Sequence, residues 1–180
     1  MLRGEPKTSS LDKFIHYTRS WERPAETEPA TNFTTPWASG ATPPSSSLPA
    51  QVAWKISAQF GEDAQHHYHR ALLEAYFTHN RTISELDVLA EIAEECDIDR
   101  VAFTEAFLAQ SEQLSQVVVE EHNSAIQHQV TAVPTIMIGG VFPIPGAQDV
   151  ETYSRYIERY IDKRAEIEAI VAEGDGGDNS

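Results

Sequence analysis

The stretch VTAVPTIMIGGVFPIPGAQ, residues 130–148, decides the fold. Residues 134–138 are apolar and rich in β-branched side chains, Gly139 and Gly140 form a turn signal, and residues 141–144 form a second short run of strand type. The two runs therefore predict a β-hairpin. The second strand is expected at a sheet edge, because a proline in it cannot donate a hydrogen bond to a neighbouring strand.

Helical patterns lie on both sides of this hairpin. After Gly146, apolar residues recur at helical spacing as far as Val171, which predicts a long amphipathic helix. Before the hairpin, the residues that follow Pro49 predict five helices. In the last two, Asp99 is expected to cap one helix and a separate helix is expected at 111–128.

The two ends of the chain carry less regular patterns. One short helix is expected at about 9–21, followed by a long loop rich in Pro, Ser and Thr. The predicted domains are the N-terminal helix and loop at 1–49, a helical subdomain at 50–129, a ββα part at 130–172 and a disordered tail at 173–180.

These features resemble the DsbA-like thioredoxin family, in its branch close to FrnE and to the 2-hydroxychromene-2-carboxylate isomerases. The resemblance covers about residues 46–161. It rests on the X-Pro bond before a strand, the Gly-Gly hairpin and the Gly-Ala-Gln turn into the last helix. Supporting residues in the helical part are Tyr76, Phe77, Ile83, Ser84, Val88 and Leu89. The resemblance implies an α+β, mostly helical chain, in which an all-helical insertion precedes the closing ββα half of a thioredoxin-like unit.

The resemblance also implies a substrate-binding site at Val133, Pro134 and Thr135. In the family, a cis-proline and the residue before it lie against the active-site dithiol, and these positions correspond to Pro134 and Val133. A cis X-Pro bond costs only about 0.5 to 1 kcal/mol. The main-chain groups of Val133 would pair with an extended peptide or with glutathione as a short added strand. The alternative is a trans proline that only begins a strand.

The nucleophile of the family has no counterpart in this sequence. In the family it is the first cysteine of a CxxC motif, or a serine, at the start of the first helix, where the helix dipole lowers the pKa of a thiol. No catalytic residue is identified, and dithiol activity is expected to be absent. The chain is expected to be either a truncated or misstarted member or a natural variant without redox chemistry.

Three functions therefore stay open. The first is a DsbA-family thiol-disulfide oxidoreductase-like protein without dithiol activity. The second is a non-enzymatic binding or dimerisation module, in which a second copy or a partner covers the strand at 134–138 and one face of the final helix. The third is a glutathione-dependent isomerase of the 2-hydroxychromene-2-carboxylate type, which would need a serine nucleophile.

Composition excludes some partners. The chain has 28 acidic and 13 basic residues among 180, a formal net charge of −15. Such a chain repels phosphate backbones, so neither nucleic acid nor an anionic membrane surface is expected as a partner. No apolar run reaches the roughly 18 to 20 residues that span a bilayer, and residues 1–7 lack the apolar centre of a secretory signal. A cytoplasmic location is therefore expected.

The single cysteine, Cys96, cannot form an internal disulfide, a CxxC pair or a cysteine-based zinc site. Its neighbours Glu94, Glu95 and Asp97, together with a helix C-terminus, are expected to raise the pKa of its thiol. A packing role is therefore favoured over a nucleophilic one.

Other candidate sites favour ordinary explanations. His66 and His69 share one helix face and could hold a transition metal, but solvated histidines are favoured, so no metal is expected and no cofactor other than glutathione is considered. The row Tyr153, Tyr156 and Tyr160 is expected to lie in a core or an interface rather than in a cofactor site. Trp37 and Trp54 either line a groove or, the favoured interpretation, clamp the long loop.

Overall fold

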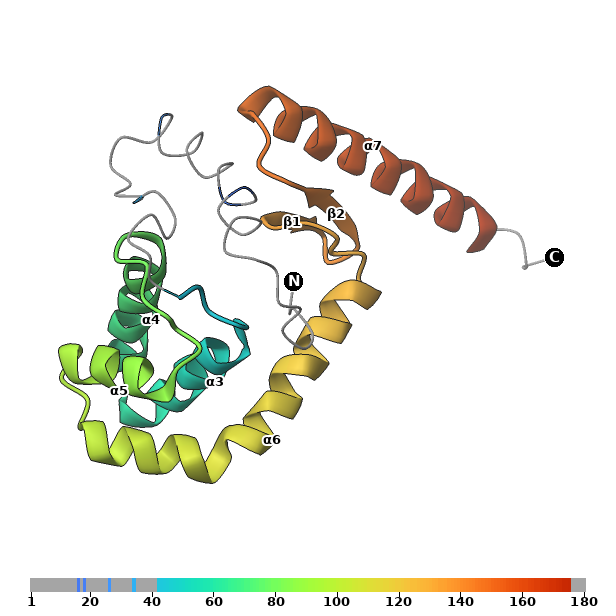
Figure 1. Ribbon diagram of the computed structural model, residues 1–180. Helices are drawn as coiled ribbons and strands as arrows, with labels where there is room; N and C mark the ends of the chain where they lie inside the picture. Colours follow the sequence, from blue (N-terminus) through green and yellow to red (C-terminus); the bar gives the residue numbers. More distant parts are fainter. Residues whose placement is uncertain (1–15, 17, 19–25, 27–33, 35–41, 176–180) are drawn as a thin grey trace. The chain divides into compact units, whose positions relative to one another are not determined.

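The computed structural model has the α+β architecture that the sequence predicts. It describes His16, Thr18, Glu26, Thr34 and residues 42–175. In chain order the elements are α3 (Leu48–Ser57), η2 (Ala58–Phe60), α4 (Glu62–Phe77), α5 (Leu86–Glu95), α6 (Arg100–Gln127), β1 (Thr135–Ile138), β2 (Phe142–Pro145) and α7 (Val150–Asp175) (Figure 1). Within the described residues, no helix combines the length and the apolar character needed to cross a membrane.

The chain divides into two compact units, Met1–His122 and Asn123–Ser180. The division falls inside α6, whereas the sequence predicts a boundary after Gln129. The predicted helix at 9–21 and the loop as far as residue 41 lie outside the described residues, apart from four single positions.

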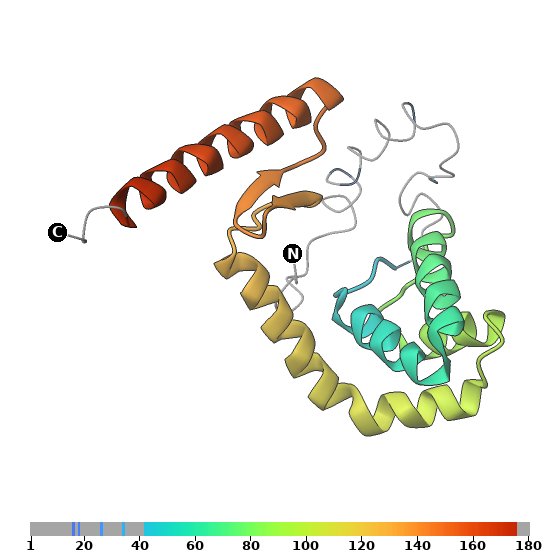
Figure 2. The ribbon, with the colours of Figure 1, turned by 180° about the vertical axis from the view of Figure 1, so that it is seen from behind.

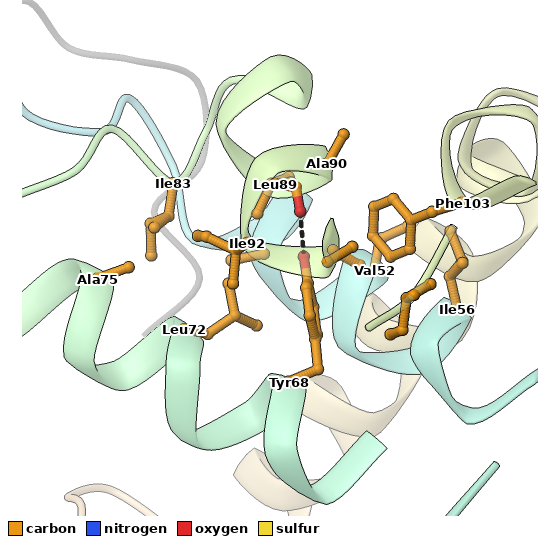
Figure 3. Close-up of a cluster of buried hydrophobic side chains, with 14 of the residues drawn as sticks. Val52, Ile56, Tyr68, Leu72, Ala75, Ile83, Leu89, Ala90, Ile92 and Phe103 are labelled. Atoms are coloured by element: carbon orange, nitrogen blue, oxygen red, sulfur yellow. Dashed lines mark hydrogen bonds between the residues drawn. The ribbon is translucent and has the colours of Figure 1, made fainter. Parts of the chain in front are cut away.

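The first unit is built around a helical core. Its buried apolar side chains come from α3, α4, α5, α6 and the loops on either side of α5, and Figure 3 shows labelled members of this cluster meeting between the helices. The largest are Ile56, Tyr68, Leu89, Ile92 and Phe103, each with no exposed surface. Within each helix the apolar residues recur at helical spacing, so each helix turns one apolar stripe toward the others.

One polar group lies inside this core. The Tyr68 hydroxyl donates a hydrogen bond to the Leu89 carbonyl oxygen at 3.0 Å. Burial is the largest cause that raises the pKa of this phenol far above its ordinary value. Tyr68 therefore stays protonated, and its hydrogen bond ties α4 to α5.

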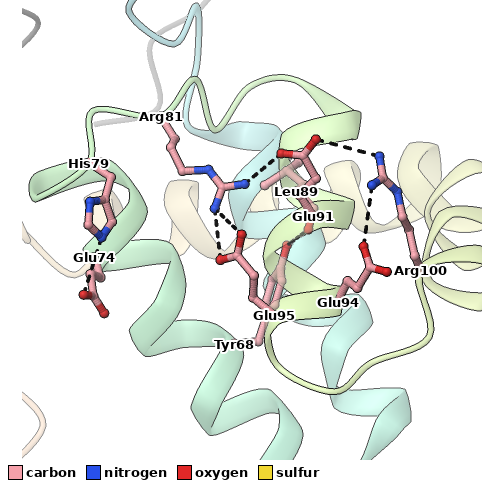
Figure 4. Close-up of polar contacts among 9 residues, drawn as sticks. All are labelled: Tyr68, Glu74, His79, Arg81, Leu89, Glu91, Glu94, Glu95 and Arg100. Atoms are coloured by element: carbon pink, nitrogen blue, oxygen red, sulfur yellow. Dashed lines mark hydrogen bonds and ion pairs between the residues drawn. The ribbon is translucent and has the colours of Figure 1, made fainter. Parts of the chain in front are cut away.

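Ion pairs hold the outer face of α5 (Figure 4). Arg81, in the loop before α5, contacts Glu91 at 2.9 Å and Glu95 at 2.8 Å, and Arg100 lies 3.9 Å from Glu91 and 3.6 Å from Glu94. The carboxylates are largely exposed to solvent, so each pair contributes little to stability. The network links the loop at Arg81 and the start of α6 to α5.

One local prediction for the helices is wrong. The helices predicted from Asp99 and at 111–128 are one helix, α6, because no glycine or proline interrupts residues 100–127. Asp99 does cap this helix, since its carboxylate accepts the Ala102 N–H at 2.7 Å.

The second unit holds the predicted hairpin and final helix, which Figure 2 shows from behind. The strands are antiparallel, with Thr135 opposite Pro145 and Ile138 opposite Phe142. The connection therefore has three residues rather than the two expected. Helix α7 continues to Asp175, past the predicted start of the tail at residue 173, because one glycine near a helix end does not by itself stop the helix.

Candidate functional site

The predicted binding residues lie at the entry to β1. Val133 is 86% exposed, and its peptide bond to Pro134 is cis. The Thr135 hydroxyl donates a hydrogen bond to the Ala132 carbonyl oxygen, which holds the turn that carries Val133. In the described part of the chain, no hydrogen bond joins the main-chain N–H or C=O of Val133 to another residue. The structure thus brings Val133, Pro134 and Thr135 together with Val133 open to solvent.

The main-chain N–H and C=O groups of the hairpin point alternately toward and away from the partner strand. Along an antiparallel pair, successive residues point their N–H and C=O toward the partner strand and away from it in turn. The Gly146 N–H donates to the Pro134 carbonyl oxygen at 2.8 Å, which sets this alternation. The main-chain N–H and C=O of Ile136 and Ile138 then point toward β2. Thr135 and Met137 therefore point their N–H and C=O away from β2, to the free edge of β1.

The two edges of the hairpin differ in what they can bind. On β2 the outward positions are Pro143 and Pro145, opposite Met137 and Thr135. Neither proline has an N–H to donate, so a strand cannot pair regularly with this edge. Among the described residues β1 pairs with β2 alone, and its outer edge retains the N–H groups of Thr135 and Met137. The free edge of β1 is the one that can accept a further strand.

The tyrosines of α7 hold this hairpin against the helix. The Tyr156 ring lies 5.9 Å from that of Phe142, and the Tyr153 hydroxyl lies 3.4 Å from the Gly146 carbonyl oxygen. Tyr160 lies so close to Gly139 that a Cβ there would be 2.6 Å from its Cζ atom. The predicted role of this tyrosine row in a core or interface, rather than in a cofactor site, agrees with these contacts.

The N-terminus of α7 is capped by Asp149. Its carboxylate accepts the Thr152 N–H at 2.7 Å. Hydrogen bonds from the main chain and the hydroxyl of Thr152 hold the pKa of Asp149 below its ordinary value. The capped helix therefore starts at a defined point after β2 and brings Tyr153 over the hairpin.

A shallow pocket of about 380 Å³ lies at the tip of the hairpin. Its lining residues are Val141, Tyr160, Lys163, Arg164 and Glu168. Arg164 is paired with Glu168 at 2.8 Å, and that carboxylate raises the pKa of the guanidinium. This ion pair neutralises Arg164 and leaves Lys163 as the remaining charged side chain of the lining.

Cys96 has the character of a packing residue. It lies at the C-terminus of α5, partly buried against the helical core. Burial, followed by the charges of Glu95 and Asp97, raises the pKa of its thiol, as the sequence predicts. A thiol of this kind is a poor nucleophile at neutral pH.

The histidines and Trp54 show contacts of their own. His69 lies against the Trp54 ring with centroids 5.7 Å apart, and the rings of His66 and His67 are 6.5 Å apart. Within the described part of the chain, no three His, Cys, Asp or Glu side chains lie together as a metal site would require. Trp37, the other member of the predicted clamp, lies outside the described residues.

The sequence predicts an uncovered strand at 134–138 but does not single out Met137 as a residue whose main-chain groups point outward from it. The role of Met137 depends on its main-chain groups and not on its side chain. The direction of these groups follows from the register that places it opposite Pro143. The alternation of Pro143 and Pro145 in the sequence was the available signal, because prolines two residues apart occupy the same edge of a strand.

Comparison with known proteins agrees with this architecture. Residues 41–158 match the family model described as DSBA-like thioredoxin domain. A segment of 92 residues is 30% identical to the uncharacterized protein YwbO of Bacillus subtilis strain 168, covering 51% of this chain and 45% of that protein, so the match spans less than half of the relative. The fold is similar to the crystal structure of a provisionally named protein disulfide isomerase from Nitrosomonas europaea, with a TM-score of 0.63 and 16% identity over 86% of this chain and 76% of that one.

Proposed function

Because this chain belongs to the DSBA-like thioredoxin domain family, we propose that it is a thiol-disulfide oxidoreductase-like protein that binds an extended peptide at Val133, Pro134 and Thr135 and supplies no dithiol of its own. The free edge of β1 carries this proposal. It offers main-chain donors and acceptors that no described residue uses, next to an exposed Val133. The proposed subdivision is the branch of FrnE and the 2-hydroxychromene-2-carboxylate isomerases, and the proposed compartment is the cytoplasm.

The chemistry of the ligand follows from the groups on offer. The N–H and C=O of Val133 suit another main chain in an extended conformation, which gains affinity from backbone hydrogen bonds. Pro134 adds an apolar ring. Glutathione carries peptide groups too and is the alternative ligand, as the isomerase interpretation requires. Thr135 contributes by positioning, since its hydroxyl holds the turn at Ala132.

Replacing Val133 with proline tests the binding site. Val133→Pro removes the N–H that a bound peptide would use, and the loss of one hydrogen bond, about 0.5 to 1.5 kcal/mol, should weaken binding about two- to tenfold. Calorimetric titration with a capped peptide of alternating valine and serine would measure the affinity. Val133→Ala, which keeps the N–H, is the matched control and should bind nearly as well as the unchanged chain.

Two results would count against this site. One is equal affinity of the proline and alanine variants, since the N–H would then play no part. The other is the absence of binding by the unchanged chain. A parallel titration with reduced glutathione separates the alternatives, because binding of glutathione without binding of the peptide would favour the isomerase interpretation.

The 180-residue chain should not reduce disulfides catalytically. A dithiol cycle needs two thiols, and the sequence holds one, Cys96, with a raised pKa. In an insulin reduction assay with dithiothreitol, the rate with this chain should equal the rate with dithiothreitol alone. The Cys96→Ser variant should give the same rate. Turnover comparable to an intact thioredoxin-like enzyme would refute this expectation.

A further inference from the structure

We propose that β1 pairs with β1 of a second copy of this chain, so that two hairpins form one four-stranded sheet in a homodimer. This pairing and peptide binding at Val133 use the same edge of β1, because the register places Val133 of one copy opposite Gly139 of the other. A bound peptide and a second copy therefore exclude each other. Three features of the described residues favour this pairing: the register of the free edge, the absence of proline and charge in β1, and the exposed apolar residues along α7.

The edge is self-complementary. An antiparallel pair centred on Ile136 places Thr135 of one copy opposite Met137 of the other. Both residues point their N–H and C=O outward, so each of the two Thr135–Met137 pairs can exchange two hydrogen bonds. A two-fold axis through Ile136 therefore satisfies the free groups of both strands at once.

Strand β1 lacks the features that usually protect an edge. Natural edge strands carry prolines, charged side chains or bulges that discourage pairing. Strand β2 has Pro143 and Pro145 at its outward positions. Strand β1, with the sequence TIMI, has neither proline nor charge and pairs with β2 without a bulge. Only one of the two edges of this hairpin is therefore protected.

The exposed apolar residues of α7 lie in one stripe. Among its described side chains, the exposed large hydrophobic ones are Val150, Ile157 and Ile161, with exposed fractions of 82%, 45% and 57%. They are separated by seven and four residues, which places them on one side of a helix, with the small Ser154 between them. Such a stripe is the usual contact surface for another helix.

This stripe faces the free edge of β1. The tyrosines of α7 contact Gly146, Phe142 and Gly139 in turn. Helix α7 therefore runs parallel to β1, from the open end of the hairpin to its turn. In a right-handed helix of 3.6 residues per turn, Ile157 and Ile161 lie about a quarter turn from that tyrosine row. Ile136 lies on the same face of the hairpin as Phe142, which is the face against α7. For L-residues in a strand that runs parallel to α7 with this face toward the helix, β2 lies on one side of β1. Ile157 and Ile161 then lie on the opposite side, above the free edge.

The spacing of the proposed dimer is consistent with helix packing. The midlines of the two hairpins would be two strand spacings apart, about 9.4 to 9.8 Å. Helices pack with their axes about 8 to 10 Å apart. The two copies of α7 would therefore touch, and their apolar stripes would cover each other and the half-exposed Ile136. A second copy thus covers both the edge and the stripe, which explains the choice of this partner.

The test compares two substitutions at Met137. Proline at this position removes the outward N–H, while the hydrogen bonds between β1 and β2 stay intact because Met137 faces away from β2. Sedimentation equilibrium at physiological salt, over micromolar to submillimolar concentration, should give twice the 20.0 kDa of one chain for the unchanged protein. Met137→Pro should raise the dissociation constant of the dimer at least tenfold, and Met137→Leu should leave this constant unchanged.

A second pair of variants tests the helix contact. Ile161→Lys places a charge in the proposed helix interface and should also dissociate the dimer. Asp162→Asn changes the charge by the same amount on the far side of α7 and should not. Circular dichroism of each variant checks that the fold is kept. The proposal is overturned if the unchanged chain stays monomeric at every concentration, or if it forms dimers that neither Met137→Pro nor Ile161→Lys weakens.

Discussion

Replacing Phe103 with alanine should destabilise the helical unit by about 3 to 5 kcal/mol, the usual cost of removing a large aromatic side chain from a core. Phe103 has no exposed surface. Its ring lies 5.4 Å from that of Tyr68 and 6.4 Å from that of Phe60, so its removal opens a cavity between α4 and α6. Since a domain of this size is stable by about 5 to 15 kcal/mol, this loss is a large part of the total.

Urea unfolding followed by tryptophan fluorescence measures this effect. Trp54 lies in α3, in the first unit, so the change in its emission reports the unfolding of that unit. Leu108→Ala on the same helix is the matched control, because Leu108 is 68% exposed, and it should change the free energy of unfolding by no more than about 0.5 kcal/mol. Equal destabilisation by the two variants would show that Phe103 is not the centre of this core.

Replacing Gly139 with alanine should strongly destabilise the hairpin. Gly139 has a φ of +58°, a left-handed conformation that costs a residue with a side chain about 1 to 2 kcal/mol. Its new Cβ would also overlap the hydroxyl and Cζ of Tyr160, and such overpacking costs about 1 to 3 kcal/mol more. The total is about 2 to 5 kcal/mol.

The neighbouring glycine is a control for the backbone term. Gly140 has a φ of +74° and open space around its Cα, so Gly140→Ala should show the conformational cost alone. Amide hydrogen exchange at Ile136 and Ile144, which pair across the hairpin, measures the free energy of local opening. Equal exchange in the two variants would mean that Tyr160 does not pack against the turn.

Local features were predicted well, because their causes lie within a few residues. The turn at Gly139 and Gly140 and the cap at Asp99 belong to this group. The split of α6 into two helices was wrong, although the sequence holds no glycine or proline that would require it. The raised pKa of Cys96 was predicted from its acidic neighbours, while burial, its largest cause, depends on packing with residues far along the chain.

The sequence by itself determined where the hairpin lies, that helices precede and follow it in the chain and that one cysteine is present. Turn glycines, prolines and apolar periodicity act over one or two turns of chain. The sequence also predicted an uncovered strand at 134–138, and only the tertiary structure decided which main-chain groups of that strand point outward. Register makes Thr135 and Met137 point outward opposite two prolines, and the contact of Tyr156 with Phe142 fixes which side of α7 lies against the hairpin. Both results depend on how separate elements pack together, which no short stretch of sequence specifies.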